Sequence, residues 1–119
     1  MESLYLHPPI LEQHGVEGAV LWNTLCSPFR LNMEAIEDFI AGTQIQFTAT
    51  ELKTCTDLTY KQQVSAVKSL EKAGLITCKE EEGTLASWTF RFTQEGVGIV
   101  IETLHFKIAD NDKRSKYLQ

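Results

Sequence analysis

The chain has 119 residues, of which 43% are apolar and 23% are charged, and its formal net charge is −5. This length is typical of a single domain, and the apolar fraction is enough for one compact core, which excludes a disordered chain. No apolar run approaches the roughly 20 residues that a membrane span needs. No basic start precedes an apolar block, so we expect a cytoplasmic protein without a secretory signal.

The residue types that serve most often in metal sites and catalysis are scattered along the chain. Three cysteines and three histidines occur without a C-x-x-C pair or an H-E-x-x-H motif, so neither a disulfide framework nor a zinc site is expected. The chain also lacks a Gly-rich phosphate loop and a G-x-S-x-G elbow. We therefore expect no enzyme, no metal and no cofactor, and we expect Cys26 and Cys55 to be small core residues.

The first predicted elements are two helices. Pro8-Pro9 opens a short helix that Gly15 ends. An amphipathic helix over residues 16–26 follows, with Trp22 at the edge of its buried face. The residues expected to face inward are Val16, Ala19, Val20, Leu25 and Cys26.

A third helix and a short strand come next. Asn32 can cap a helix over Met33–Ala41, which Gly42 ends. The alternating stretch Gln44-Ile45-Gln46-Phe47 predicts a strand that pairs with a later hairpin. The residues that the helix is expected to bury are Met33, Ile36, Phe39 and Ile40.

Two capping boxes mark the next two helices. In Thr48-Ala49-Thr50-Glu51 the Thr48 hydroxyl can accept from the N–H of Glu51, whose carboxylate can accept from the N–H of Thr48. Thr59-Tyr60-Lys61-Gln62 repeats the pattern, which leaves room for only a short first helix and a tight turn. The apolar face of that helix is expected to hold Leu52, Cys55 and Leu58.

The second capped helix leads into a hairpin. It is predicted to run from about Tyr60 to Ala73, where Gly74 suits a left-handed C-terminal cap and Lys72 suits the helix dipole. Glu80-Glu81-Glu82-Gly83 carries the turn signal of the hairpin. The buried faces are expected to hold Val64, Val67 and Leu70 on the helix and Trp88, Phe90 and Phe92 on the return strand.

Thr93 is predicted to cap a final helix from Gln94 to about Ala109, in which Gly96 and Gly98 each cost about 1 kcal/mol relative to Ala. The helix is apolar on more than one face, which indicates a second apolar surface to cover. We expect the domain to span residues 1–109, with a flexible tail over 110–119. A homodimer is expected through Ile99, Ile101, Leu104, Phe106 and Ile108.

Together these elements predict an α+β fold, mostly α: a winged helix-turn-helix with a small antiparallel sheet and extra N- and C-terminal helices. Leu58-Thr59, followed by Leu70-Glu71-Lys72-Ala73-Gly74-Leu75-Ile76, resembles the recognition-helix-into-wing segment of MarR-type regulators. Phe92-Thr93-Gln94-Glu95-Gly96, which opens a helix after the wing, is similar to the same point in those chains. The chain is equally similar to the N-terminal winged-helix domains of phage and plasmid replisome-organiser proteins, especially at His7-Pro8-Pro9-Ile10-Leu11. The helix differs from these families at Gln63, where an apolar residue is usual, and at Ser65, where Arg or Lys is common.

This resemblance implies a sequence-specific DNA-binding protein, either a transcriptional regulator or a replication-initiation protein of a mobile element. Residues 60–76 carry three lysines against one glutamate, a local charge of +2, whereas residues 1–59 carry two cations against eight acids, giving −6. Local positive charge is what phosphate binding requires, although a solvated helix face would show the same lysines. The residues expected to contact double-stranded DNA are Tyr60, Lys61, Gln62, Ser65, Lys68 and Ser69.

The acidic remainder of the chain keeps a second function open. A winged-helix protein–protein interaction module without DNA binding would dock a partner on the terminal helix and on the acidic surface before Thr48. The Glu80-Glu81-Glu82 cluster is expected to be a solvated turn that repels phosphates, in preference to a metal or acid–base site.

Overall fold

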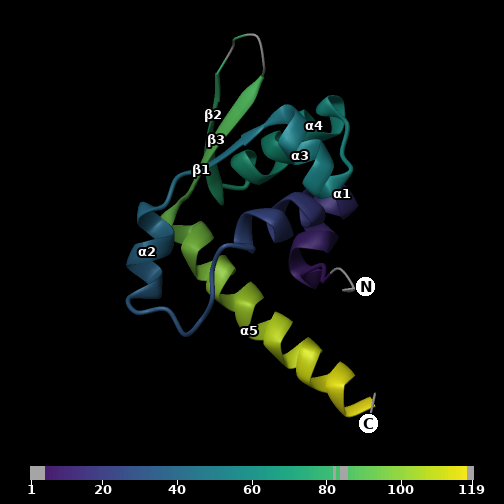
Figure 1. The fold of residues 1–119 in the computed structure, drawn as a ribbon, viewed down its shortest axis with the longest axis vertical. Coiled ribbons are helices and arrows are strands. Elements are labelled where there is room, and N and C mark those ends of the chain that lie inside the picture. Colours follow the sequence, from purple (N-terminus) through teal and green to yellow (C-terminus); the bar gives the residue numbers. More distant parts are fainter. Residues whose placement is uncertain (1–4, 82, 84–85, 118–119) are drawn as a thin grey trace.

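The computed structural model describes residues 5–81, 83 and 86–117, which form five helices and one three-stranded antiparallel sheet (Figure 1). The α+β, mostly helical class expected from the sequence is confirmed. Two helices precede the first strand, two more lie between that strand and the hairpin, and a long helix follows. Within the described residues, no helix is both long and apolar enough to cross a membrane.

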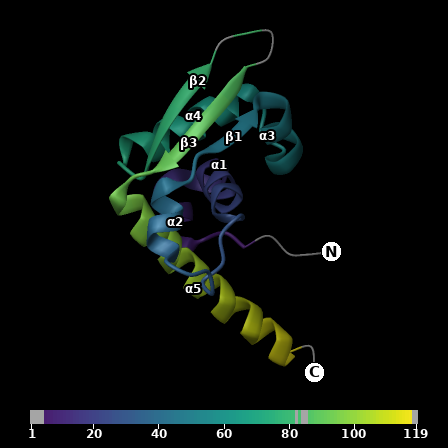
Figure 2. The same cartoon turned by 60° about the vertical axis from the view of Figure 1, so that its left-hand side comes forward.

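The sheet is built from β1 (Ile45–Thr48), β2 (Ile76–Glu81) and β3 (Ser87–Phe92) in the order β1-β3-β2. The central residue Phe90 pairs with Ile45 on one side and with Cys78 on the other, so the predicted strand before the helix pair does join the hairpin. Helices cover one face of the sheet and leave the other face open (Figure 2). The covered face carries the buried side chains Trp88, Phe90 and Phe92, as predicted.

Helix α1 (Pro8–Cys26) is bent at Gly15, whose φ of 72° and ψ of −178° lie outside the helical region, so two helical segments meet there as predicted. The buried side of the second segment differs from the expectation. Trp22 has no exposed surface, and its indole N–H donates to the Thr103 hydroxyl at 3.0 Å. Val16 is 61% exposed, because it lies in the first turn after the bend, opposite the centre of the buried face.

Helix α2 covers Ile36–Gly42, so the predicted start at Met33 with a cap at Asn32 is wrong. Ala35 precedes the helix in a left-handed conformation with φ of 50°, and residues 31–35 form turns. The later start changes which side chains face inward. Ile40 is buried, whereas Phe39 is 49% exposed and touches Phe29 edge-on, with ring centroids 5.8 Å apart.

Helices α3 (Ala49–Thr56) and α4 (Tyr60–Lys72) begin at the two predicted capping boxes. The Thr48 hydroxyl accepts from the Glu51 N–H at 3.0 Å, and the Glu51 carboxylate accepts from the Thr48 N–H at 2.9 Å. Leu52 is buried as expected, but Cys55 is exposed. Thr56 takes the inward position instead, since its hydroxyl donates to the Leu52 carbonyl and accepts from the Leu58 N–H.

One buried amide connects these helices to the sheet. Gln63 is only 1% exposed, although the sequence marked it as an unusual polar residue. Its Nε2 donates to the carbonyls of Ala49 and Leu58, each at 3.0 Å, and its Oε1 accepts from the Trp88 indole N–H at 3.2 Å. A buried polar side chain with all these partners fixes the relative positions of the start of α3, the turn and β3.

Helix α5 (Gln94–Tyr117) continues past the predicted end near Ala109, so most of the expected tail is helical; residues 118–119 lie outside the described residues. Its first turn is joined to the end of α4, because the Thr93 hydroxyl donates to the Gly74 carbonyl and accepts from the Gly96 N–H. The far part of α5 extends beyond the other elements, at the end of the molecule opposite the hairpin (Figures 1 and 2).

Candidate nucleic-acid interface

Four side chains of α4 form a single exposed stripe on the side of the helix away from the core. Lys61, Ser65, Lys68 and Lys72 are all exposed and follow the spacing i, i+4, i+7, i+11. At 3.6 residues per turn this spacing keeps them within about 60° of arc. The opposite side of α4 holds the buried residues Gln63, Ala66, Val67 and Leu70. We call the four exposed residues the lysine stripe.

The positive charge of the stripe is not neutralised by neighbouring acids. Within the part of the chain that the structure describes, Lys61, Lys68 and Lys72 form no ion pair. The only acidic residue of α4, Glu71, is turned towards β2, where its carboxylate accepts from the Cys78 N–H at 3.3 Å. The stripe therefore presents three ammonium groups and one hydroxyl to solvent.

Helix α1 and the hairpin flank the stripe on its two sides. On one side the Ser69 hydroxyl lies 2.6 Å from Nδ1 of His14 on α1. On the other side Tyr60, the first residue of α4, stacks on Trp88 with ring centroids 6.0 Å apart, and its hydroxyl donates to the Glu80 carboxylate. Both flanks are thus held by side-chain contacts with other elements.

The structure separates the six residues expected at the interface into two groups. Lys61, Ser65 and Lys68 lie together on the stripe. Tyr60, Gln62 and Ser69 lie at its flanks, and each has a side-chain oxygen in an intramolecular hydrogen bond; that of Gln62 accepts from the Thr59 N–H at 2.9 Å. Lys72 completes the stripe and was not among the six. Its position four residues after Lys68 is the sequence signal that could have identified it.

The sequence predicts a turn at the acidic part of the hairpin, but the structure continues strand β2 into it. Glu80 and Glu81 belong to β2, and Glu82 lies outside the described residues. Because β2 extends this far, consecutive side chains point to opposite faces of the sheet. Glu80 pairs with Trp88 on the face that carries α4, whereas Glu81 pairs with Ser87 on the open face. Only the first of these two carboxylates lies beside the lysine stripe.

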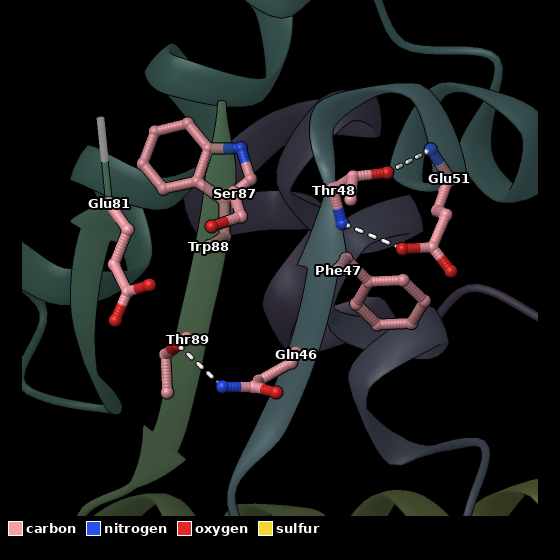
Figure 3. Close-up of a pocket in the computed structure, with 8 residues that line it drawn as sticks. All are labelled: Gln46, Phe47, Thr48, Glu51, Glu81, Ser87, Trp88 and Thr89. Carbon is pink, nitrogen blue, oxygen red and sulfur yellow. Dashed lines mark hydrogen bonds between the residues drawn. The ribbon is translucent and has the colours of Figure 1, made fainter. Parts of the chain in front are cut away.

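A pocket lies between β1 and β3 on the sheet, close to the start of α3 (Figure 3). The Thr48–Glu51 capping box forms one wall, and Gln46 donates to the Thr89 hydroxyl across the strands at 3.4 Å. None of the described residues that line the pocket is basic, and the carboxylates of Glu51 and Glu81 would repel an anion. Among the described residues, no group of three or more His, Cys, Asp or Glu side chains is placed to hold a metal ion.

Two titratable groups next to α4, His14 and Cys78, are neutral near pH 7. Burial lowers the pKa of His14, so its imidazole adds no positive charge to the flank of the stripe. Burial, together with the charges of Glu71 and Glu80, raises the pKa of the Cys78 thiol to about 12. A thiol with such a pKa is a poor nucleophile, so Cys78 does not make this surface reactive.

Comparison of the chain with protein-family models, with curated proteins and with solved structures gave no match.

Proposed function

We propose that this protein binds double-stranded DNA as a winged helix-turn-helix domain, with α4 as its recognition helix. The observation that supports this most is the lysine stripe, which is free of acidic side chains and lies on the outward face of α4. The major groove of B-DNA admits an α-helix, and neutralisation of phosphates by Lys and Arg supplies much of the affinity. The net charge of −5 is compatible with this function because three of the eleven cations lie together on one face of α4, in a stripe that contains no acidic residue.

The stripe residues would have different roles along the helix. In helix-turn-helix proteins the N-terminal residues of the recognition helix contact base edges. Lys61 and Ser65 lie in the first half of α4 and would hydrogen-bond to bases, while Lys68 and Lys72 would contact phosphates. The resemblance to MarR-type and replisome-organiser domains supports a cytoplasmic role in transcription regulation or in replication initiation of a mobile element.

A titration with fluorescently labelled duplex DNA of mixed sequence tests the proposal. We expect binding between about 50 and 200 mM salt that weakens as salt rises. Lys61→Ala, Lys68→Ala and Lys72→Ala should each weaken binding; the two phosphate-contact changes, Lys68→Ala and Lys72→Ala, should also each reduce the salt slope by about one. Lys79→Ala is the matched control, because Lys79 is exposed on the open face of the sheet. Equal effects of all four changes, or no binding at the lowest salt, would contradict α4 as the recognition helix.

We also propose that the protein is a homodimer through the far part of α5. Phe106 and Ile108 are 54% and 50% exposed there, whereas Leu104, which was expected at the dimer contact, is buried in the domain's own core. A two-fold dimer would place two copies of α4 at successive half-sites on DNA. Light scattering at tens of micromolar should give the dimer mass, and Ile108→Asp should give the monomer. A monomeric wild-type protein would rule the dimer out.

A protein–protein interaction module remains the second candidate function. The same exposed Phe106 and Ile108 favour it, together with the exposed acids Glu37 and Asp38 on α2. Exposed apolar residues rimmed by polar ones are typical of protein-binding surfaces. If no duplex DNA binds at low salt, a partner should be sought on these two surfaces.

A further inference from the structure

The hairpin contacts the recognition helix at the position where that helix would enter the groove. Tyr60 is the first residue of α4 and is 47% exposed. Its hydroxyl donates to the Glu80 carboxylate, and its ring stacks on Trp88 of β3 at an interplanar angle of 27°. A carboxylate of the hairpin is therefore held beside the start of α4.

We propose that the Tyr60–Glu80 contact is an affinity latch, which weakens binding to every DNA sequence by the same factor, so that only sequences with favourable base contacts are occupied. The proposal rests on the DNA-binding function proposed above. Glu80 is the residue that would lower the affinity, and Tyr60 is the residue that positions it. Neither residue needs to touch a base for the latch to act.

The negative charge of Glu80 is the first reason. Within the described residues Glu80 forms no ion pair, and the adjacent Lys79 points to the opposite face of the sheet. The hydrogen bond from Tyr60 restricts where the carboxylate can move. A DNA backbone that approaches the first turn of α4 would therefore meet a negative charge that is held in place.

The occupied hydroxyl of Tyr60 is the second reason. A tyrosine at the start of a recognition helix could donate a hydrogen bond to a phosphate oxygen. Here the hydroxyl already donates to Glu80, so a phosphate contact would require that this charge-assisted bond be broken. Both effects act on the backbone, which is the same in every sequence.

A penalty that is equal for all sequences leaves the ratio of two affinities unchanged but lowers the occupancy of every site. Backbone contacts supply most of non-specific binding, whereas base contacts distinguish one sequence from another. When backbone affinity is reduced, only sequences that add base contacts with Lys61 and Ser65 remain occupied at a limiting protein concentration.

Glu81 provides a matched control for Glu80. It is the next residue of the same strand and is also exposed, but it pairs with Ser87 and lines the pocket on the sheet (Figure 3). A change at either position removes one negative charge from the hairpin. Only a change at Glu80 removes it from the side that carries α4.

The test compares Glu80→Gln with Glu81→Gln on two duplexes: one of mixed sequence and one selected by the wild-type protein from a random pool. Glu80→Gln should bind the mixed duplex about fivefold more tightly at low salt, as expected for one unit charge near a phosphate in hydrated surroundings. Glu80→Gln should tighten binding to the selected duplex by the same factor, so that the affinity ratio between the two duplexes stays unchanged. Glu81→Gln should change either affinity by less than about twofold. Thermal melting checks that both variants remain folded.

A double-mutant cycle tests whether Tyr60 holds the carboxylate. In a Tyr60→Phe background the hydrogen bond is absent, so the tightening caused by Glu80→Gln should be smaller than in the wild-type background. An undiminished effect would show that Tyr60 does not position Glu80.

The failure of the latch can be distinguished from the failure of the proposed function. Equal tightening by Glu80→Gln and Glu81→Gln would mean a general charge effect and would overturn the latch alone. If the wild-type protein binds DNA and Glu80→Gln does not change its affinity, the latch is also overturned. Absence of wild-type binding to both the random pool and the mixed duplex would overturn DNA binding itself.

Discussion

Replacement of Gly96 by alanine tests how closely α5 packs against the end of α4. A Cβ atom added at Gly96 would lie 2.0 Å from the Leu75 carbonyl oxygen and 3.0 Å from the Leu75 carbonyl carbon. The same oxygen accepts from the Thr93 N–H at 3.1 Å, so it cannot move away without weakening that bond. Alanine at this position therefore requires the first turn of α5 to shift away from the chain that follows α4.

The expected cost can be worked out from these contacts. In an exposed helix, Gly→Ala gains about 1 kcal/mol. Overlap with the backbone typically costs about 1–3 kcal/mol, and a weakened hydrogen bond costs about 1 kcal/mol more. The net loss is then about 2 kcal/mol. For an unfolding entropy of about 2.1 cal/mol/K per residue this is a fall of roughly 8 °C in Tm.

Gly98→Ala is the matched control on the same helix. No atom lies within 4 Å of a Cβ at Gly98, so this variant should gain up to about 1 kcal/mol, a rise of roughly 4 °C in Tm. Thermal unfolding followed by circular dichroism measures both variants. Shifts of the same sign for the two variants would refute the close packing at Gly96.

Three further predictions concern stability. Gln63→Leu removes the donor to two carbonyls and the acceptor of the buried Trp88 indole N–H and should cost about 3 kcal/mol in urea unfolding, so an unchanged midpoint would contradict the buried network. Thr48→Ala removes the α3 cap and should cost about 1 kcal/mol; a midpoint equal to wild type would mean that the cap contributes nothing. Burial lowers the pKa of both His7 and His14, so the unfolded chain takes up their protons first, near pH 6.5. Stability should then fall as the pH drops below about 6.5, and His7→Gln or His14→Gln should reduce this slope; an unfolding midpoint that rises from pH 6.5 towards pH 5 would contradict the prediction.

The sequence predicts best those features that depend on neighbours three or four residues away. The capping boxes at Thr48 and Thr59 locate the starts of α3 and α4, because each box is closed by residues within one turn. The left-handed Gly74 was likewise predicted from its position after the apolar pattern of α4. These local signals were sufficient to give the order of elements from β1 to β3.

Features that depend on distant neighbours were not predictable in this way. Gly96 and Gly98 look alike in sequence, but only Gly96 packs against the backbone of Leu75. At the candidate interface the lysines were predicted from charge, whereas the partners of Tyr60 and Ser69 lie 20 and 55 residues away in the chain. Nothing local in the sequence pairs these residues, so their hydroxyls were expected to face DNA.

The junction at Thr93 makes α5 a lever arm for α4. Hydrogen bonds from Thr93 to the carbonyls of Gly74 and Leu75 join the start of α5 to the residues that follow α4. At 1.5 Å per residue a helix of 24 residues is about 36 Å long, so a tilt of about 5° moves its far end by about 3 Å. A partner that holds the far end at a given position therefore sets the angle of the junction to within a few degrees. In the proposed complex with DNA, the angle between α4 and the groove would then be adjustable from a point remote from the DNA itself.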